Sequence, residues 1–179
     1  MRSYKNVTAL QGNVSLSIPS EWNHHKVIHG WAADCRGCSY SEPADYFGED
    51  ALMERPLTAP KKSFCTISSN IIPGSLQRSY QFAPNVREKK RTLKIKDPSA
   101  INEQIVVSAK NKTIEVSYQG RMDTTSPLYY YKSISYYGLN RQVEISFKGL
   151  DSAEFQEAIA VMRNSIRIKP AFLNQEIDE

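Results

Sequence analysis

The chain has 179 residues, of which 40% are hydrophobic and 10% aromatic, and this is enough for one domain with a real core. Its formal net charge of +4 is mild. A nucleic-acid binder usually has a stronger basic face with interleaved aromatic residues, so we expect no nucleic-acid partner. No apolar run approaches the roughly 20 residues that cross a bilayer, and no transmembrane segment is predicted.

The first residues show no leader sequence. Met1 to Val7 carry a positive charge but lack the apolar stretch that defines a secretory signal. We therefore expect a cytoplasmic protein as the chain stands, and a periplasmic one if a signal peptide was removed.

An alternating strand opens the regular part of the chain. Residues 1–12 have no regular pattern and are expected to be a loose lead-in. Over 13–18 apolar residues alternate with serines, which is the period of a strand with one buried face. Pro19 ends this strand because it has no N–H to donate. Trp22 is expected to fold back as a plug for the core, and a short second strand is predicted over 26–29.

The segment 31–62 breaks this pattern. It is rich in Gly, Pro and acidic residues, and a connection of this length in a compact domain is usually functional or disordered. We interpret it as an insertion, with a short helix expected over 45–53. Its acidic side chains would form either an electrostatic docking surface or simply a solvated loop. The partner-binding residues predicted here are Glu42, Asp45, Tyr46, Glu49 and Asp50.

The middle of the chain is expected to be mainly strands. A strand is predicted over 64–68 and an edge strand over 92–96, with a single helical turn over 98–104. Runs of β-forming residues around short polar turns then predict two hairpins. These hairpins join 105–108 to 113–118 and 128–137 to 141–147.

A helix closes the pattern. Asp151 as the N-cap, with Glu154 three residues later, resembles a capping box. Apolar residues at helical spacing mark a face that packs on the sheet, namely Phe155, Ala158, Ile159 and Met162. A last strand is expected over 166–168, residues 170–179 are predicted to be a tail, and fraying is expected over 174–179.

The strand over 129–137 is unusually rich in tyrosine. Tyr129, Tyr131 and Tyr137 share one face, while Tyr130 and Tyr136 share the other. If one face packs on the core, the other exposes at least two rings. Tyrosine offers a large contact area to a partner, although it is also a common strand residue. We predict Tyr129 and Tyr131 as partner-binding residues.

No motif for catalysis stands out. The chain lacks a phosphate-binding glycine loop, a zinc-protease motif and a nucleophile elbow, so we predict no catalytic residue, no cofactor and no enzyme activity. Cys35 and Cys38 form a CxxC, which Cys65 and one of the three histidines would complete as a zinc site. We prefer the interpretation as loop thiols or one disulfide, and predict no metal ligand.

Two short stretches resemble a known family. Ile18-Pro19-Ser20-Glu21-Trp22, after an alternating strand, is similar to the opening of PsbP-like domains. The capped helix followed by Asn164-Ser165-Ile166-Arg167-Ile168 resembles the close of these domains. The resemblance covers the regions 13–29 and 128–168.

This resemblance implies an α+β fold, with an antiparallel β-sheet flanked by a C-terminal amphipathic helix and short helices. It implies a single domain over 1–179, with a PsbP-like core over 13–168 that carries the 31–62 insertion, and a tail over 170–179. Members of the family are usually binding modules rather than enzymes. In bacteria they include accessory proteins of type VI secretion.

The leading hypothesis for function is therefore a bacterial immunity protein. It would bind a cognate toxin or secreted effector and occlude the active site of that partner. The foldable core, the long acidic segment and the absence of a catalytic motif favour this hypothesis. Two other hypotheses stay open: an effector-loading chaperone, which needs an apolar groove for a helix, and a zinc-binding or small-ligand-binding protein.

Overall fold

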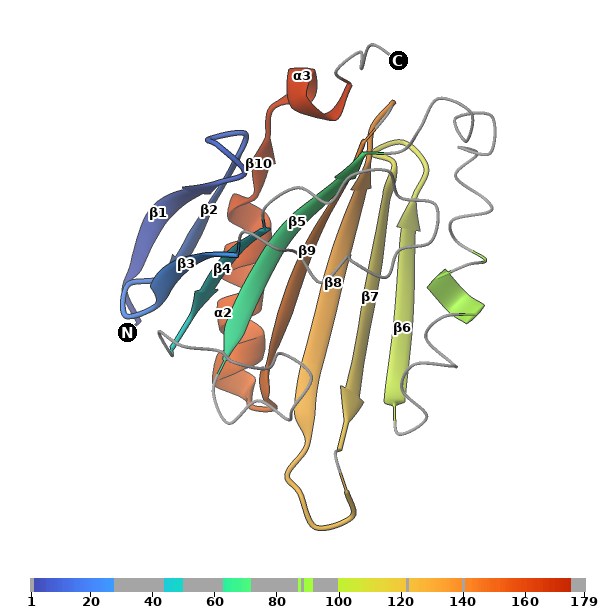
Figure 1. Ribbon diagram of the computed structural model, residues 1–179. Helices are drawn as coiled ribbons and strands as arrows, with labels where there is room; N and C mark the ends of the chain where they lie inside the picture. Colours follow the sequence, from blue (N-terminus) through green and yellow to red (C-terminus); the bar gives the residue numbers. More distant parts are fainter. Residues whose placement is uncertain are drawn as a thin grey trace.

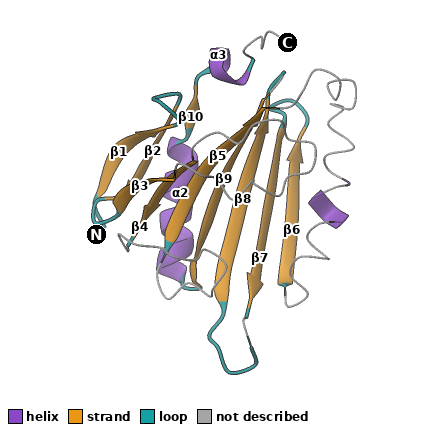
Figure 2. Cartoon of the chain, viewed as in Figure 1, coloured by secondary structure: helices purple, strands orange, loops and turns teal. Residues whose placement is uncertain are grey.

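The computed structural model describes residues 2–27, 44–49, 63–71, 87, 89–91, 100–121, 123–139 and 141–174. In this part of the chain two antiparallel β-sheets are combined with a few helices, which is an α+β fold (Figures 1 and 2). No described helix is long and apolar enough to cross a membrane. The strand predicted over 92–96 and most of the predicted 31–62 insertion lie outside the described residues.

The smaller sheet has three strands in the order β1-β2-β10. β2 (Val14–Pro19) is the predicted alternating strand, and its apolar side chains are fully buried. β1 (Tyr4–Ala9) pairs with it, so the expectation of a loose lead-in over 1–12 was wrong. The reason is that its partner, β2, offers a free edge for backbone hydrogen bonds, which an irregular side-chain pattern does not prevent. β10 (Arg167–Ile168) pairs with the other edge of β2.

The larger sheet has seven strands in the order β3-β4-β5-β9-β8-β7-β6. Its two predicted hairpins, β6–β7 and β8–β9, are confirmed, as is the strand predicted over 64–68. The strands are β3 (Asn23–Val27), β4 (Ala44–Gly48), β5 (Phe64–Ile71), β6 (Ile101–Ser108), β7 (Thr113–Gly120), β8 (Tyr129–Tyr137) and β9 (Arg141–Leu150). The helical turn expected over 98–104 was wrong, because β6 already begins at Ile101 and pairs with β7.

Helix α2 (Ala153–Ser165) contacts β2 and β9, one strand from each sheet, and lies behind the large sheet in Figure 1. The predicted apolar stripe of Phe155, Ala158, Ile159 and Met162 is buried. The N-cap is Ser152 rather than Asp151, since the Ser152 hydroxyl accepts a hydrogen bond from the Phe155 N–H at 3.0 Å.

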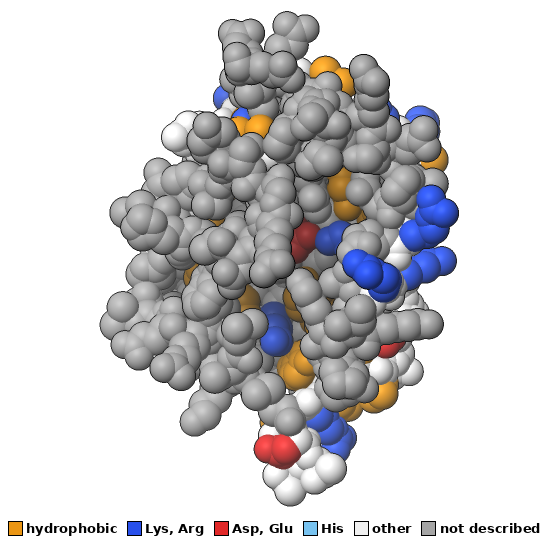
Figure 3. Space-filling view, turned by 45° about the vertical axis from the view of Figure 1, so that its right-hand side comes forward, with side chains coloured by type: hydrophobic (Ala, Val, Ile, Leu, Met, Phe, Trp, Pro, Cys, Tyr) orange, Lys and Arg blue, Asp and Glu red, His pale blue; other side chains and the backbone are white. Residues whose placement is uncertain are grey.

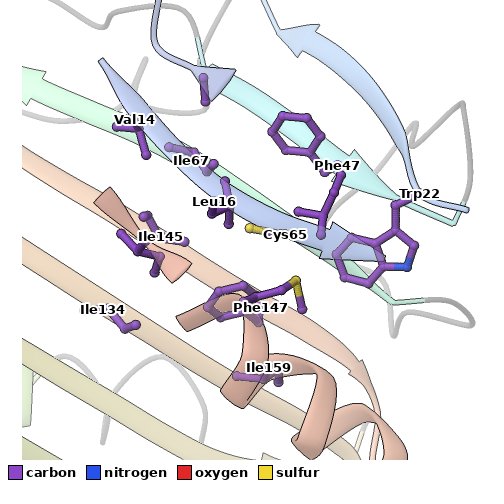
Figure 4. Packing of buried hydrophobic residues seen from close by; sticks show 14 of the residues in the cluster. Val14, Leu16, Trp22, Phe47, Cys65, Ile67, Ile134, Ile145, Phe147 and Ile159 are labelled. Carbon is purple, nitrogen blue, oxygen red and sulfur yellow. The ribbon is translucent and has the colours of Figure 1, made fainter. Parts of the chain in front are cut away.

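The main core lies between α2 and the two sheets. Trp22 is fully buried there, as predicted. Figure 4 shows Leu16 of β2 and Trp22 on one side of this cluster, with Phe147 of β9 and Ile159 of α2 on the other. Cys65 also lies in this cluster and has no exposed surface.

The chain end is more ordered than predicted. Helix α3 (Pro170–Leu173) follows β10, with Pro170 at its start, where a missing N–H costs nothing. Phe172 lies under the Arg141 guanidinium, whose carbon is 4.0 Å from the ring centre. The predicted tail therefore begins with a short helix that packs on β9 through Phe172 and Arg141. Residues 175–179 lie outside the described part.

Candidate functional site

The register of the large sheet sorts its side chains onto two faces. Tyr130 and Tyr136 lie on the face that packs against the main core and α2. Tyr129, Tyr131 and Tyr137 lie on the opposite face, which confirms the alternation predicted from the sequence. We call this opposite face the tyrosine face.

An aromatic cluster stands at one end of the tyrosine face. The rings of Tyr118 and Tyr131 lie side by side with centroids 4.9 Å apart, and Tyr129 meets Tyr118 edge-on at 6.4 Å. The ammonium group of Lys148 is 4.6 Å from the centre of the Tyr129 ring. We call these four residues the tyrosine cluster.

The members of the tyrosine cluster differ in exposure. Tyr129 is 5% exposed, whereas Tyr118 and Tyr131 are half-buried. Gly120 makes room for Tyr129, because a Cβ at this position would come within 2.5 Å of the Tyr129 ring. Tyr129 is therefore the buried support of the cluster, and Tyr118 and Tyr131 each keep part of their surface exposed.

A polar centre adjoins this cluster on the same face. Lys89 donates a hydrogen bond to Glu144 Oε2 at 2.7 Å, and the Ser135 hydroxyl donates to the same oxygen at 3.3 Å. Ser146 connects the pair to the tyrosine cluster, because its hydroxyl is 3.4 Å from the Tyr131 hydroxyl and 3.5 Å from Glu144 Oε1. The Lys89 and Glu144 side chains are only 24% and 29% exposed.

Burial and the Glu144 charge shift the pKa values of two groups in this centre. Burial acts to lower the pKa of Lys89, but the charge and hydrogen bond of Glu144 outweigh it, and the pKa is raised. Burial, helped by the Glu144 charge, raises the pKa of Tyr131. At neutral pH the Lys89 ammonium is thus paired with Glu144, and the Tyr131 phenol beside them is neutral.

The acidic stretch predicted to bind a partner is placed differently from the prediction. The short helix expected over 45–53 was wrong for its described start, because Ala44–Gly48 forms the inner strand β4. Asp45 and Tyr46 are only 5% and 6% exposed. The aromatic residues Tyr46 and Phe47 have strand propensity, and they outweigh the acid Asp45 within the same run.

The Asp45 carboxylate ties distant parts of the chain together. Its Oδ2 accepts the backbone N–H of Leu10 at 2.7 Å, and its Oδ1 lies 2.6 Å from His24 Nε2. Leu10 stands in the β1–β2 turn with a positive φ of 50°, as does Gln11 at 58°. The His24 ring also stacks on Phe47, with centroids 4.7 Å apart. The Asp45 carboxylate therefore holds the β1–β2 turn against β3 and β4.

The other predicted acidic residues have separate outcomes. Glu49 is half-buried, and its Oε2 accepts the Ser63 N–H at 3.1 Å. Glu42 and Asp50 lie outside the described residues, so their role in binding stays a prediction.

Sequence reasoning missed an ion cluster on the α2 side of the sheet. Arg163 of α2 makes two hydrogen bonds to Glu115 of β7, at 2.6 and 2.7 Å. Lys132 of β8 lies 3.7 Å from the same carboxylate. Glu115 and Arg163 are 48 positions apart, and no local pattern links them. The sequence signal for this cluster was limited to the charged Glu115 within a predicted strand, on the side that faces α2.

One of the three cysteines lies in the described part of the chain. Cys65 is enclosed among the apolar side chains of the main core, and burial raises the pKa of its thiol. Cys35 and Cys38 lie outside the described residues. Within the described residues there is no group of three His, Cys, Asp or Glu side chains that could hold a metal ion.

Comparison with known proteins identifies the fold. No protein-family model matches the chain, and no curated protein sequence matches it significantly. Its structure is similar to that of the PsbP protein CyanoP from Synechocystis sp. PCC 6803, with a TM-score of 0.51 and 8% identity over 94% of both chains. The fold is PsbP-like.

Two further solved structures share this PsbP-like fold. The Ran-binding protein Mog1p of Saccharomyces cerevisiae matches with a TM-score of 0.53 and 7% identity, over 97% of this chain and 100% of its own. LpqN of Mycobacterium tuberculosis, described as involved in cell envelope biogenesis, matches with a TM-score of 0.55 and 10% identity, over 94% and 91% of the two chains. At these identities the likeness concerns the fold alone.

Proposed function

We propose that this PsbP-like domain is a protein-binding module without enzyme activity, and that it acts as an immunity protein. It would bind a toxin or secreted effector and occlude the active site of that partner. The tyrosine cluster is the observation that carries the proposal. It is an aromatic surface supported by the buried Tyr129. Tyrosine is enriched among the residues that contribute most binding energy in protein interfaces.

The geometry of the cluster supports a binding role. Tyr131 is fixed between the Tyr118 ring and the Ser146 hydroxyl, so little side-chain entropy is left to lose when a partner binds. The cluster offers the ring edges of packed tyrosines together with the Tyr131 hydroxyl. These groups suit a partner segment that presents apolar side chains.

The fold is compatible with such a role. Mog1p, which shares the PsbP-like fold, is by its description a Ran-binding protein. One domain of this shape therefore binds another protein. The binding residues that we now propose are Tyr118 and Tyr131, together with the earlier predictions Glu42, Glu49 and Asp50. We propose that the buried Asp45, Tyr46 and Tyr129 support this surface without contacting the partner.

The proposal is tested by capture of the partner from the native host on the tagged protein, followed by an activity assay. An immunity protein should recover one toxin-like protein at near-equal stoichiometry and should abolish its toxicity when both are co-expressed. A partner that stays active in the complex would indicate an effector-loading chaperone instead. A partner recovered equally well by a Tyr118→Ala, Tyr131→Ala double variant would contradict the tyrosine cluster as the binding surface.

A further inference from the structure

Strand β6 forms an edge of the large sheet. It ends the strand order, with β7 on one side and no described strand on the other. Val106 is 56% exposed and Val107 is 42% exposed, although they point to opposite faces. Ile101 adds a third exposed apolar side chain at 49%. An edge of this kind presents unpaired backbone groups flanked by apolar side chains.

Strand β6 differs from two other edge strands in the part of the chain that the structure describes. Those two strands carry a positive charge, with Lys5 in β1 and Arg167 in β10. Lysine and arginine on an edge discourage pairing with another chain. The regular part of β6, Gln104–Ser108, has neither a charge nor a proline. The nearest charge, Glu103, stands in the irregular step between Ile101 and Gln104, next to Asn102 with its positive φ.

We propose that the occupant of this edge is a second copy of the chain, paired antiparallel through β6. A two-fold axis normal to the sheet places the same face of both copies on the same side. Residues that stand opposite each other then point their side chains to that one face, so their numbers must be both even or both odd. The register centred on Val106 satisfies this condition. It places Val106 opposite itself, Ile105 opposite Val107, and Gln104 opposite Ser108.

This register is self-complementary. Apolar residues meet apolar residues on both faces, one amide meets one hydroxyl, and no like charges stand opposite each other. Ile105 already packs on the small cluster of Ile114, Val116 and Tyr137, so the pairing would extend that cluster across the two copies. The two seven-stranded sheets would then form one continuous sheet. This inference does not depend on the proposed function.

Light scattering and sedimentation of the full chain test the proposal. The protein concentration should be varied from about 1 to about 100 µM, because a small interface dissociates and assembles in this range. We expect twice the mass of one chain at the upper end. Val106→Lys should raise the dissociation constant at least roughly a hundredfold, because two lysines would face each other. The matched control Val161→Lys, at a 38% exposed site on α2, should leave the dimer intact. A wild-type protein that stays monomeric, or a dimer that Val106→Lys does not weaken, would overturn the proposal.

Cross-linking tests the register without relying on a destabilising change. In a background with Cys35→Ser and Cys38→Ser, Val106→Cys should form an intermolecular disulfide on oxidation, because the two copies of residue 106 stand opposite each other. Gln104→Cys is the control. Its two copies would be four residues apart along the strands, or roughly 13 Å, and should not cross-link. Equal cross-linking of both variants, or none at position 106, would contradict this register.

Discussion

The carboxylate of Asp45 allows a sharp test of how the β1–β2 turn is held. Asp45→Ala removes the acceptor for the buried Leu10 N–H and the contact with His24. Removing one partner of a buried hydrogen bond leaves the other unpaired, which costs about 1–3 kcal/mol, with the upper end expected for a bond to a charged group. The His24 contact adds little, since that side chain is 49% exposed. We expect Asp45→Ala to lower the free energy of unfolding by about 3 kcal/mol.

Urea unfolding followed by circular dichroism measures this loss. With a slope of about 2 kcal/mol per molar urea, the midpoint should fall by roughly 1.5 M. Asp45→Asn should lose only about 1 kcal/mol, because its amide oxygen still accepts the Leu10 N–H. The matched control is Glu49→Ala, which removes one half-exposed contact with the Ser63 N–H and should cost about 1 kcal/mol or less. If Asp45→Ala lowered the free energy of unfolding no more than Glu49→Ala does, the role of Asp45 in stabilising the β1–β2 turn would be refuted.

Two further changes test the ion cluster and the core. Hydrogen bonds from Arg163 lower the pKa of Glu115 below its ordinary 4.5, so the stability from this pair is present above about pH 4.5 and is lost as the pH falls through the lower folded-state value. Glu115→Gln should therefore cost about 1 kcal/mol at neutral pH and almost nothing near pH 2 in urea titrations, and a pH-independent cost would contradict the ion pair. Cys65→Ser should destabilise the core by about 1–3 kcal/mol, because a hydroxyl would be buried among apolar groups. In the wild type, the Cys65 thiol should resist iodoacetamide until urea unfolds the chain, as peptide mapping would show, and rapid labelling of the folded protein would disprove its burial.

Local periodicity made most of the fold predictable. Apolar residues repeat with the period of a strand in β2 and in both hairpins, and with the period of a helix in α2. The buried side chains follow the same period. The division into two sheets was not predictable, because β1 has no alternating pattern of its own and β10 has only two residues, so both depend on pairing with β2.

The candidate site was predictable only in part. Alternation along β8 placed Tyr129 and Tyr131 on one face, but burial of Tyr129 depends on Gly120 of the neighbouring strand, which the sequence of β8 does not contain. Asp45 was predicted to bind a partner from the acidic 31–62 segment, because acids usually lie on the surface. Its burial depends on a backbone N–H 35 positions away, and such a long-range partner leaves no local signal.

The binding of the recovered partner to three forms of the protein tests the central claim most directly. Interferometry should compare the wild type with Tyr131→Ala and with Tyr4→Ala, a half-buried tyrosine on the other sheet that serves as the control. We expect Tyr131→Ala to weaken binding at least about tenfold, as for a tyrosine at the centre of an interface, while Tyr4→Ala binds like the wild type. Unchanged affinity of a folded Tyr131→Ala variant, or the absence of any stoichiometric protein partner, would contradict a protein-binding role for the tyrosine cluster.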